Sequence, residues 1–503
     1  MGDQNSRDVV VPAGELTGDS ATESGTSRRD FLKSGAGVVA GGAAAQWLPG
    51  RPLGQGDAGE LRRLQGARRI LLRGGVVLTL DPAMGDFAQA DVLIEDGRIR
   101  EVRPNVTAGD AVVVDATNMI VLPGFIDTHH HCAQGLLRSI LTNGLLDPDY
   151  RRDITTTLTP AYSADEAYAG ELISALGIIE GGTTTVVDTS QVSHTPEHSD
   201  AMIRALQEAG IRAVYAYYRG EGANHQYPQD IVRLQRTYFN SPDQLLTLGM
   251  ASAFNTANLA DIMAYAREVG VPLYSHGVSD ATERIVLELG RAGQLRPGDE
   301  YIHCNHLSDA TWNLIRDSGG VVSSAVPIEM AMGHGRPAIQ DALDHGVRPS
   351  LSSDVDATMA QDPFTNMRGA FTLQRLDLLQ RKRNGEENLP PLLTCREVLE
   401  FATVEGARAA GLTDKVGTLT PGKEADVVLL RADRWSIWPL NNAPGAVVNL
   451  MDTGNVDAVF IGGQVRKWRG SLVSVDRARV LRLVEQARDA LVQRSGFEMN
   501  LLG

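Results

Sequence analysis

The sequence predicts a parallel (β/α)8 barrel and a small β-sandwich domain formed by both ends of the chain. From residue 183 onwards, short apolar runs recur every 20 to 34 residues, the length of a strand followed by a helix. With an earlier run at 120–127 they make eight strands, the number that closes such a barrel. The later runs begin near residues 183, 212, 246, 271, 300, 320 and 348.

The N-terminal residues are typical of an export signal. The segment Ser27-Arg28-Arg29-Asp30-Phe31-Leu32-Lys33 precedes a Gly/Ala-rich run that is too short to anchor the chain in a membrane. It resembles a twin-arginine signal, and Ala43-Ala44-Ala45 resembles a cleavage site. We expect residues 1–45 to be this signal peptide, read by the twin-arginine export machinery, and residues 46–68 to be a linker. The mature protein would then be periplasmic or extracellular.

Composition narrows the function classes. The formal net charge of −15 and the lack of a basic stripe argue against nucleic acid as a partner. The three cysteines cannot all be paired, so no disulfide framework is expected, and we expect Cys132 and Cys304 to pack in the core. No lysine lies between Lys33 and Lys382.

Short β-rich runs separated by turns lie on both sides of the barrel. They predict that residues 69–119 and 415–470 together form the β-sandwich, around a barrel at 120–414. Residues 471–503 carry apolar positions at helical spacing and are expected to form a C-terminal helix.

The first barrel strand ends in a His-X-His pair. Side chains alternate faces along a strand, so His129 and His131 project to the same side and can share a metal ion. The intervening His130 points to the opposite face, where we expect it to pack behind the strand. The pair predicts a metal site at the mouth of the barrel.

Three further polar residues end apolar runs, namely His276, His303 and Asp354. The active site of a parallel barrel lies at the carboxyl ends of its strands, so these residues are expected to meet the His-X-His pair. Three imidazoles and one carboxylate, from His129, His131, His276 and Asp354, suit Zn²⁺ first, with Fe²⁺ or Mn²⁺ as alternatives. His303 would then be free for catalysis.

The interval between the first two barrel strands is about twice the others. Residues 133–162 are therefore expected to form an excursion over the barrel mouth, where substrate loops belong. Gln134 in this excursion could bind substrate or be a solvated loop residue. Asp356 follows Asp354 on the same face and is expected to orient a metal ligand.

Together these motifs resemble the amidohydrolase superfamily, in particular the branch that contains cytosine deaminase and the chlorotriazine hydrolases. The resemblance covers about residues 69–470. It rests on Pro123-Gly-Phe-Ile-Asp-Thr-His-His-His, Gly182-Thr-Thr-Thr-Val-Val-Asp, His303-Cys-Asn-His-Leu-Ser, Ser353-Asp354 and Gly417-Thr-Leu-Thr-Pro-Gly-Lys-Glu-Ala-Asp-Val-Val.

The resemblance implies a hydrolase of a small molecule, which cleaves a non-peptide carbon–nitrogen bond by attack of metal-bound hydroxide. His303 would polarise the water or the substrate, and Asp354 would take a proton from the water. Other branches bridge two metals with a lysine from the fourth barrel strand, and this sequence has no lysine between Lys33 and Lys382. One divalent ion per chain is therefore expected. Assembly into a homo-oligomer is implied only by analogy with the family.

One position departs from the deaminase pattern. Where deaminases of this branch carry a glutamate three residues after the strand-5 histidine, the sequence has Ser279. Glu329 or Asp280 could replace this acid, and Glu329, at the end of the seventh strand, would then also contact substrate. The alternatives left open are deamination of an aminopurine or aminopyrimidine, dehalogenation, cleavage of an activated amide, urea or carbamate, and a non-catalytic metal-binding barrel.

Overall fold

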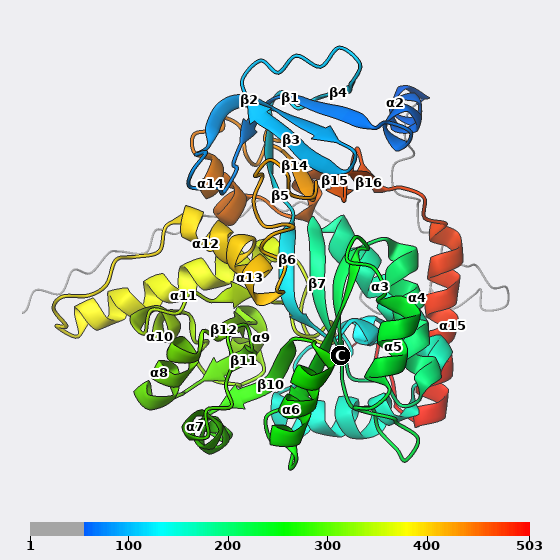
Figure 1. The fold of residues 1–503 in the computed structure, drawn as a ribbon, viewed down its shortest axis with the longest axis vertical. Helices are drawn as coiled ribbons and strands as arrows, with labels where there is room; N and C mark the ends of the chain where they lie inside the picture. Colours follow the sequence, from blue (N-terminus) through cyan, green and yellow to red (C-terminus); the bar gives the residue numbers. More distant parts are fainter. Residues whose placement is uncertain (1–54, 503) are drawn as a thin grey trace, which may run out of the picture. The chain divides into compact units, whose positions relative to one another are not determined.

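The computed structural model describes residues 55–502 (Figure 1). The predicted signal peptide and the first part of the predicted linker lie outside the described residues. The rest of that linker contains helix α2 (Gln55–Gln65), whose Leu61 and Leu64 pack on the core of the mixed sheet described below. In the described part of the chain, no helix combines the length and the apolar character needed to cross a bilayer.

Eight parallel strands form the predicted barrel. They are hydrogen-bonded in the order of the sequence, and most begin at or close to the positions predicted from the apolar runs. The strands are β6 (Phe125–His130), β7 (Thr183–Ser190), β8 (Arg212–Tyr217), β9 (Leu246–Ala253), β10 (Leu273–Ser279), β11 (Glu300–Asn305), β12 (Val321–Ser324) and β13 (Ser350–Leu351).

Helices connect successive barrel strands and continue after the last one. They are α3 (Ala164–Glu180), α4 (Pro196–Ala209), α5 (Ile231–Tyr238), α6 (Leu259–Val269), α7 (Glu283–Arg291), α8 (Asp309–Ser318), α9 (Val326–Ala331), α10 (Ile339–Asp344), α11 (Pro363–Arg383), α12 (Cys395–Phe401) and α13 (Val404–Ala409). Helix α3 begins at Ser163, where a capping box with Glu166 satisfies the first free backbone groups.

The residue that closes the barrel is Asp354, just beyond β13. Its backbone N–H donates to the carbonyl oxygen of His129 (2.9 Å), and its carbonyl oxygen accepts from the N–H of His131 (2.9 Å). Asp354 adopts a left-handed conformation (φ 59°), which is uncommon for a residue other than glycine. The last strand is thus paired with the first at the end where the His-X-His pair lies.

A separate mixed sheet is built from both ends of the chain, as predicted. Its nine strands run in the order β17-β16-β15-β14-β5-β1-β2-β3, with β4 pairing with β1. The strands are β1 (Arg69–Val77), β2 (Phe87–Glu95), β3 (Arg98–Arg103), β4 (Val112–Asp115), β5 (Met119–Pro123), β14 (Val427–Arg431), β15 (Val456–Ile461), β16 (Gln464–Trp468) and β17 (Ser471–Leu472). Backbone hydrogen bonds between Ile99 and residues 422–423 connect β3 to the segment before β14, so the sheet curls around its own core.

The single strand expected at 120–127 is two strands. Strand β5 pairs with β1 and β14 in the mixed sheet, whereas β6 belongs to the barrel, so the change of sheet falls at Gly124. A side chain at this position would lie only 2.1 Å from Oγ1 of Thr184. Glycine thus permits the close approach of β6 to β7, and the predicted boundary at residue 120 falls inside β5.

Buried Arg212, at the start of β8, joins the barrel to the mixed sheet. Its guanidinium donates to Asp426 (2.9 Å) and to Glu424 (2.5 Å), in the segment that leads into β14. These carboxylates neutralise a cation that would be costly to bury alone. The buried pair fixes the chain ends against the barrel.

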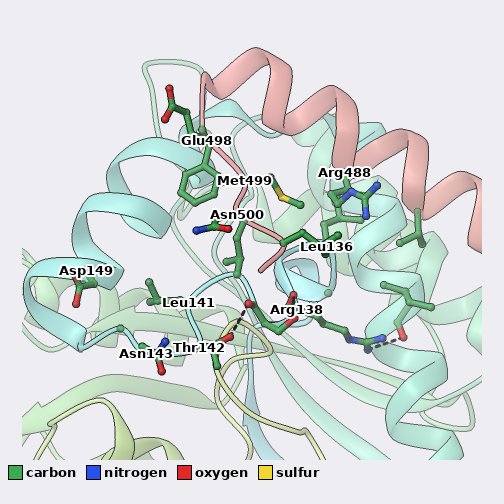
Figure 2. A pocket seen from close by; sticks show the side chains of 18 of the residues that line it. Leu136, Arg138, Leu141, Thr142, Asn143, Asp149, Arg488, Glu498, Met499 and Asn500 are labelled. Atoms are coloured by element: carbon green, nitrogen blue, oxygen red, sulfur yellow. Dashed lines mark hydrogen bonds between the residues drawn. The ribbon is translucent and has the colours of Figure 1, made fainter. Parts of the chain in front are cut away.

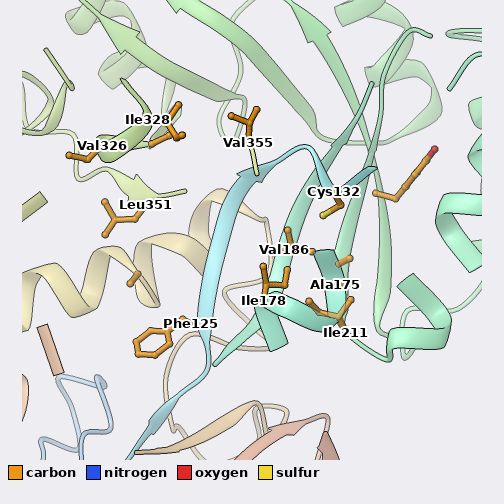
Figure 3. Packing of buried hydrophobic residues seen from close by; sticks show 14 of the residues in the cluster. Phe125, Cys132, Ala175, Ile178, Val186, Ile211, Val326, Ile328, Leu351 and Val355 are labelled. Carbon is orange, nitrogen blue, oxygen red and sulfur yellow. The ribbon is translucent and has the colours of Figure 1, made fainter. Parts of the chain in front are cut away.

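The main hydrophobic core lies between the barrel and its helices. Cys132 packs there with Ala175, Ile178 and Val186, as the close-up in Figure 3 shows. Cys304 is also fully buried in the same cluster. Both cysteines are unpaired, in agreement with the expected packing role.

The excursion after β6 is helical rather than an extended loop. It contains a 3₁₀ helix η1 (Cys132–Leu137), a π-helical segment η2 (Leu146–Leu158) and a short 3₁₀ helix η3 (Thr159–Ala161). The expected C-terminal helix, α15 (Arg477–Ser495), packs against α3 and this excursion. A cavity of about 700 Å³ lies between η1 and the chain end. Figure 2 shows side chains that line it, including Met499 and Asn500.

We predict that Gly124→Ala lowers the free energy of unfolding by about 1–3 kcal/mol, because the added methyl group overlaps Thr184 and forces β6 away from β7. Chemical or thermal denaturation measures the change. Gly109→Ala is the matched control, because a methyl group there meets nothing within 4 Å. Equal losses of stability in the two variants would contradict this account.

Candidate metal centre

The five residues predicted at the strand ends converge on one point. One ligand atom from each of His129, His276, His303 and Asp354 lies within 4.8 Å of the others. His131 joins them, because its Nε2 lies 3.4 Å from Oδ1 of Asp354 and its ring centroid 4.7 Å from that of His129. The structure thus brings the complete predicted set together.

The end of β7 orients the two histidines of the His-X-His pair. Nδ1 of His131 lies 2.9 Å from the carbonyl oxygen of Thr189, which can only accept, so this ring carries its proton on Nδ1. Nδ1 of His129 lies 3.0 Å from Oγ1 of the same threonine. Both rings therefore present Nε2 to Asp354, the arrangement in which metal-binding histidines are commonly held.

The electrostatics of this point match a cation. Nε2 of His129 is buried without a hydrogen-bond partner in the described residues and faces Oδ1 of Asp354 at 3.2 Å. The lone pair on Nε2 of His131 faces the same oxygen. Lone pairs and a carboxylate at these distances repel one another unless a positive ion lies between them, so the donor set fits a divalent metal.

The histidines are held in the form that binds metal. Burial, followed by charge repulsion from His129, lowers the pKa of His131 to about 3. Burial and the neighbouring histidines likewise lower the pKa of His276 well below its usual value. Burial opposes ionisation of Asp354, but its contacts with the surrounding histidines outweigh burial and hold the pKa of this carboxyl well below its usual value. Neutral imidazoles and an ionised carboxylate are what a metal requires.

His303 occupies the remaining side of the site. Its backbone is left-handed (φ 79°), a strained conformation that turns the chain at the end of β11. Its Nε2 lies 3.9 Å from Oδ2 of Asp354, and its ring centroid lies 5.0 Å from the ring centroid of His334. Burial disfavours its charged form, yet the hydrogen bond that His303 donates to Glu329 raises the pKa of His303.

Glu329 lies behind His303 and not in the open pocket. Its Oε1 accepts from Nδ1 of His303 (3.1 Å) and from the backbone N–H of Ala325 (2.7 Å), and Oε2 accepts from Asn305 (3.2 Å). The carboxylate is fully buried and its oxygens are occupied. This arrangement replaces the expectation that Glu329 itself contacts substrate or donates a proton to it, and gives it the role of positioning His303.

Asp280, the other candidate acid, and Asp356 make their contacts elsewhere. Asp280 is exposed, and its Oδ1 accepts from the neighbouring Ala281 N–H. Asp356, expected to orient a metal ligand, instead contacts His130, Ser174 and the guanidinium of Arg138. It faces the opposite side of β6, because the chain turns at Asp354.

His130 lies behind the strand, as expected, between two carboxylates. Nδ1 is 3.3 Å from Asp127, and Nε2 is 3.6 Å from Asp356. Burial lowers its pKa, but Asp356 and Asp127 outweigh this effect and raise the pKa to about 10. A buried ion cluster thus supports β6 directly beneath the metal-binding histidines.

Gln134 is almost completely buried in η1 rather than solvated. Its Nε2 donates to the hydroxyl oxygen of Tyr150 (2.7 Å) and to Oε1 of Gln191 (3.3 Å). Tyr150 belongs to η2, so this contact brings η2 to a residue three positions beyond His131. A further cavity of about 500 Å³ opens beside His276, lined by Tyr218, His225 and Ala253 among others.

Sequence reasoning missed Thr189, Asn305 and Tyr150. Thr189 stands at the end of a predicted strand, so its place at the mouth could have been anticipated. Asn305, two residues after His303, likewise stands at the end of a predicted strand. Tyr150 lies in an irregular segment whose course no periodicity indicates.

A model of the amidohydrolase family matches residues 120–466, most of the chain. The chain belongs to the amidohydrolase family. This amidohydrolase is 26% identical over 444 residues to a 5'-deoxyadenosine deaminase of Methanosarcina mazei, covering 84% of this chain and 99% of that one. It is 28% identical over 450 residues to a 5-methylthioadenosine/S-adenosylhomocysteine deaminase of Desulforudis audaxviator, covering 84% and 99%.

Solved structures share the fold of this amidohydrolase. An adenosine deaminase from Xanthomonas campestris with bound zinc superimposes with a TM-score of 0.75 at 20% identity, covering 84% of this chain and 98% of that one. An atrazine chlorohydrolase from Arthrobacter aurescens with zinc gives 0.73 at 19% identity, covering 83% and 100%. The predicted family and its barrel are confirmed, and the chain is a hydrolase of small molecules that acts on non-peptide carbon–nitrogen bonds.

We predict that Thr189→Val weakens metal binding about 10- to 100-fold, because it removes the hydroxyl that orients His129 without changing the size of the side chain. Zinc titration against a competing chelator measures the affinity. Thr185→Val, on the same strand, is the control, since its buried hydroxyl has no partner in the described residues. The same zinc affinity in both variants would refute the role assigned to Thr189.

Proposed function

We propose that this amidohydrolase binds one zinc ion and displaces an exocyclic amine from a small nitrogen heterocycle, with an adenosine-like nucleoside as the first candidate substrate. The observation that carries the proposal is the meeting of the imidazoles of His129, His131 and His276 with Asp354 beside His303. The names of its relatives, deaminases of 5'-deoxyadenosine and related nucleosides, support the substrate class.

His129, His131, His276 and Asp354 would hold the ion, which leaves His303 facing the substrate. The chemistry that such an ion supplies is a lowering of the pKa of water from about 15.7 to near 7. The sequence has no lysine between Lys33 and Lys382, so no lysine on a barrel strand can bridge a second ion. The expected content is therefore one ion per chain.

The remaining steps belong to side chains of the site. Asp354 can accept a proton from water on a carboxylate oxygen and later return it to the departing amine. Nε2 of His303 can hydrogen-bond the substrate, because Nδ1 is committed to Glu329. The cavity beside His276 offers room for the part of the substrate that does not react.

A second candidate is displacement of a group that leaves without protonation, such as chloride. Ser279, in the place of the usual glutamate, favours it, because a serine hydroxyl is a poor acid at neutral pH. The fold of the atrazine chlorohydrolase is compatible with this reaction. Activated amides, ureas and carbamates are the other substrate classes to be screened.

The deciding experiment combines metal analysis with a substrate screen. We expect purified protein to contain one equivalent of zinc and to release ammonia from 5'-deoxyadenosine, and a chelator to abolish the activity reversibly. Atrazine tests chloride release in the same assay. Protein that cannot bind zinc, iron or manganese would refute the proposal in favour of a non-catalytic barrel, and two tightly bound equivalents would refute the single-ion centre.

We predict that Glu329→Gln lowers kcat on the order of 10²-fold, because loss of the buried charge weakens the hold on Nδ1 of His303. Steady-state kinetics with the best substrate of the screen measure it. Asp280→Asn makes the same chemical change at the other candidate acid and is expected to leave kcat unchanged. If only Asp280→Asn impairs turnover, the assignment is reversed.

A further inference from the structure

The site lacks an acid on the side of the leaving group. Ser279 stands where the usual glutamate would be, Asp280 is exposed, and the oxygens of Glu329 are occupied behind His303. A hydrogen-bond donor on this side would stabilise the negative charge that develops on the substrate during attack. The donor should come from an element that covers the mouth.

Tyr150 in η2 is such a donor. Its hydroxyl oxygen accepts from Nε2 of Gln134 at 2.7 Å, and no contact in the described residues uses the hydroxyl hydrogen. Burial, followed by the nearby charge of Asp354, raises the pKa of Tyr150, so the hydroxyl keeps its proton. Tyr150 thus lies within electrostatic range of the metal centre with a free hydrogen.

The amide of Gln134 sets this orientation. Nε2 also donates to Oε1 of Gln191, two residues beyond the threonine that holds His129 and His131. In this arrangement Oε1 of Gln191 accepts, the nitrogen of Gln134 lies on this side, and the tyrosine oxygen accepts from it as well. Oε1 of Gln134 is then buried without a partner in the described residues, a state that is costly until a donor arrives.

We propose that Tyr150 and Gln134 form a donor–acceptor pair for the reacting end of the substrate, an inference that rests on the proposed function. The hydroxyl of Tyr150 donates a hydrogen bond to the substrate nitrogen next to the carbon under attack. Oε1 of Gln134 accepts from an N–H of the same group. The substrate therefore carries a nitrogen lone pair and an N–H group side by side on one edge, as in the N–C–NH₂ edge of a 6-aminopurine.

The test uses zinc-loaded full-length protein with 5'-deoxyadenosine, and with atrazine if chloride release is the activity found. Tyr150→Phe should lower kcat on the order of 10²-fold with little change in KM, because the hydrogen bond strengthens as charge develops. Tyr274→Phe is the matched control. It deletes the same hydroxyl from a buried tyrosine that contacts Ala410, remote from the strand ends, and should leave kcat unchanged.

Gln134→Glu provides a second variant of nearly the same shape. It removes the donor to Tyr150 and offers an acceptor, so the hydroxyl hydrogen turns away from the substrate. We expect a loss similar to that of Tyr150→Phe, and no further loss in the double variant. Unchanged zinc content and melting temperature check that each variant folds.

The possible failures are distinguishable. Wild-type kinetics with Tyr150→Phe, or fully additive losses in the double variant, would overturn the donor–acceptor pair while the proposed function stands. A wild-type protein that turns over neither probe would overturn the proposed function and this inference with it.

Discussion

The backbone pairing of Asp354 with β6 is the contact on which both the barrel and its candidate metal centre depend. The same residue closes the ring through its N–H and carbonyl groups and aims its carboxylate at His129 and His131. Ring closure and ligand geometry are therefore one constraint. A shift of the last strand would separate the carboxylate from the imidazoles.

The elements around this contact hold the site rigid. Thr189 orients both histidines of β6, Glu329 orients His303, and Asp127 with Asp356 encloses the cationic His130 behind the strand. Each of these polar groups is buried, so a conformation that broke its contact would leave it unpaired at a cost in free energy. The left-handed backbone at His303 and Asp354 stores strain that this network sustains.

The chemistry follows from an asymmetry in the site. In the proposed function, His129, His131, His276 and Asp354 would hold the ion on the side of the attacking water, whereas Ser279 stands where a carboxylic acid is expected on the side of the leaving group. Tyr150 and Gln134 come from the excursion over the mouth and offer neutral hydrogen bonds there. The relatives include a 5'-deoxyadenosine deaminase, and an atrazine chlorohydrolase shares the fold.

The sequence by itself determined the barrel, the mixed sheet from both ends, and the set of His129, His131, His276, His303 and Asp354, because strand periodicity and spacing place those residues at one edge. Only the tertiary structure decided that the first strand divides at Gly124, that Glu329 lies behind His303 and Asp356 beside His130, and that Tyr150 contacts Gln134. These outcomes depend on close packing between strands and on the course of irregular segments. Neither leaves a periodic pattern in the chain, since contacts distant in sequence select them.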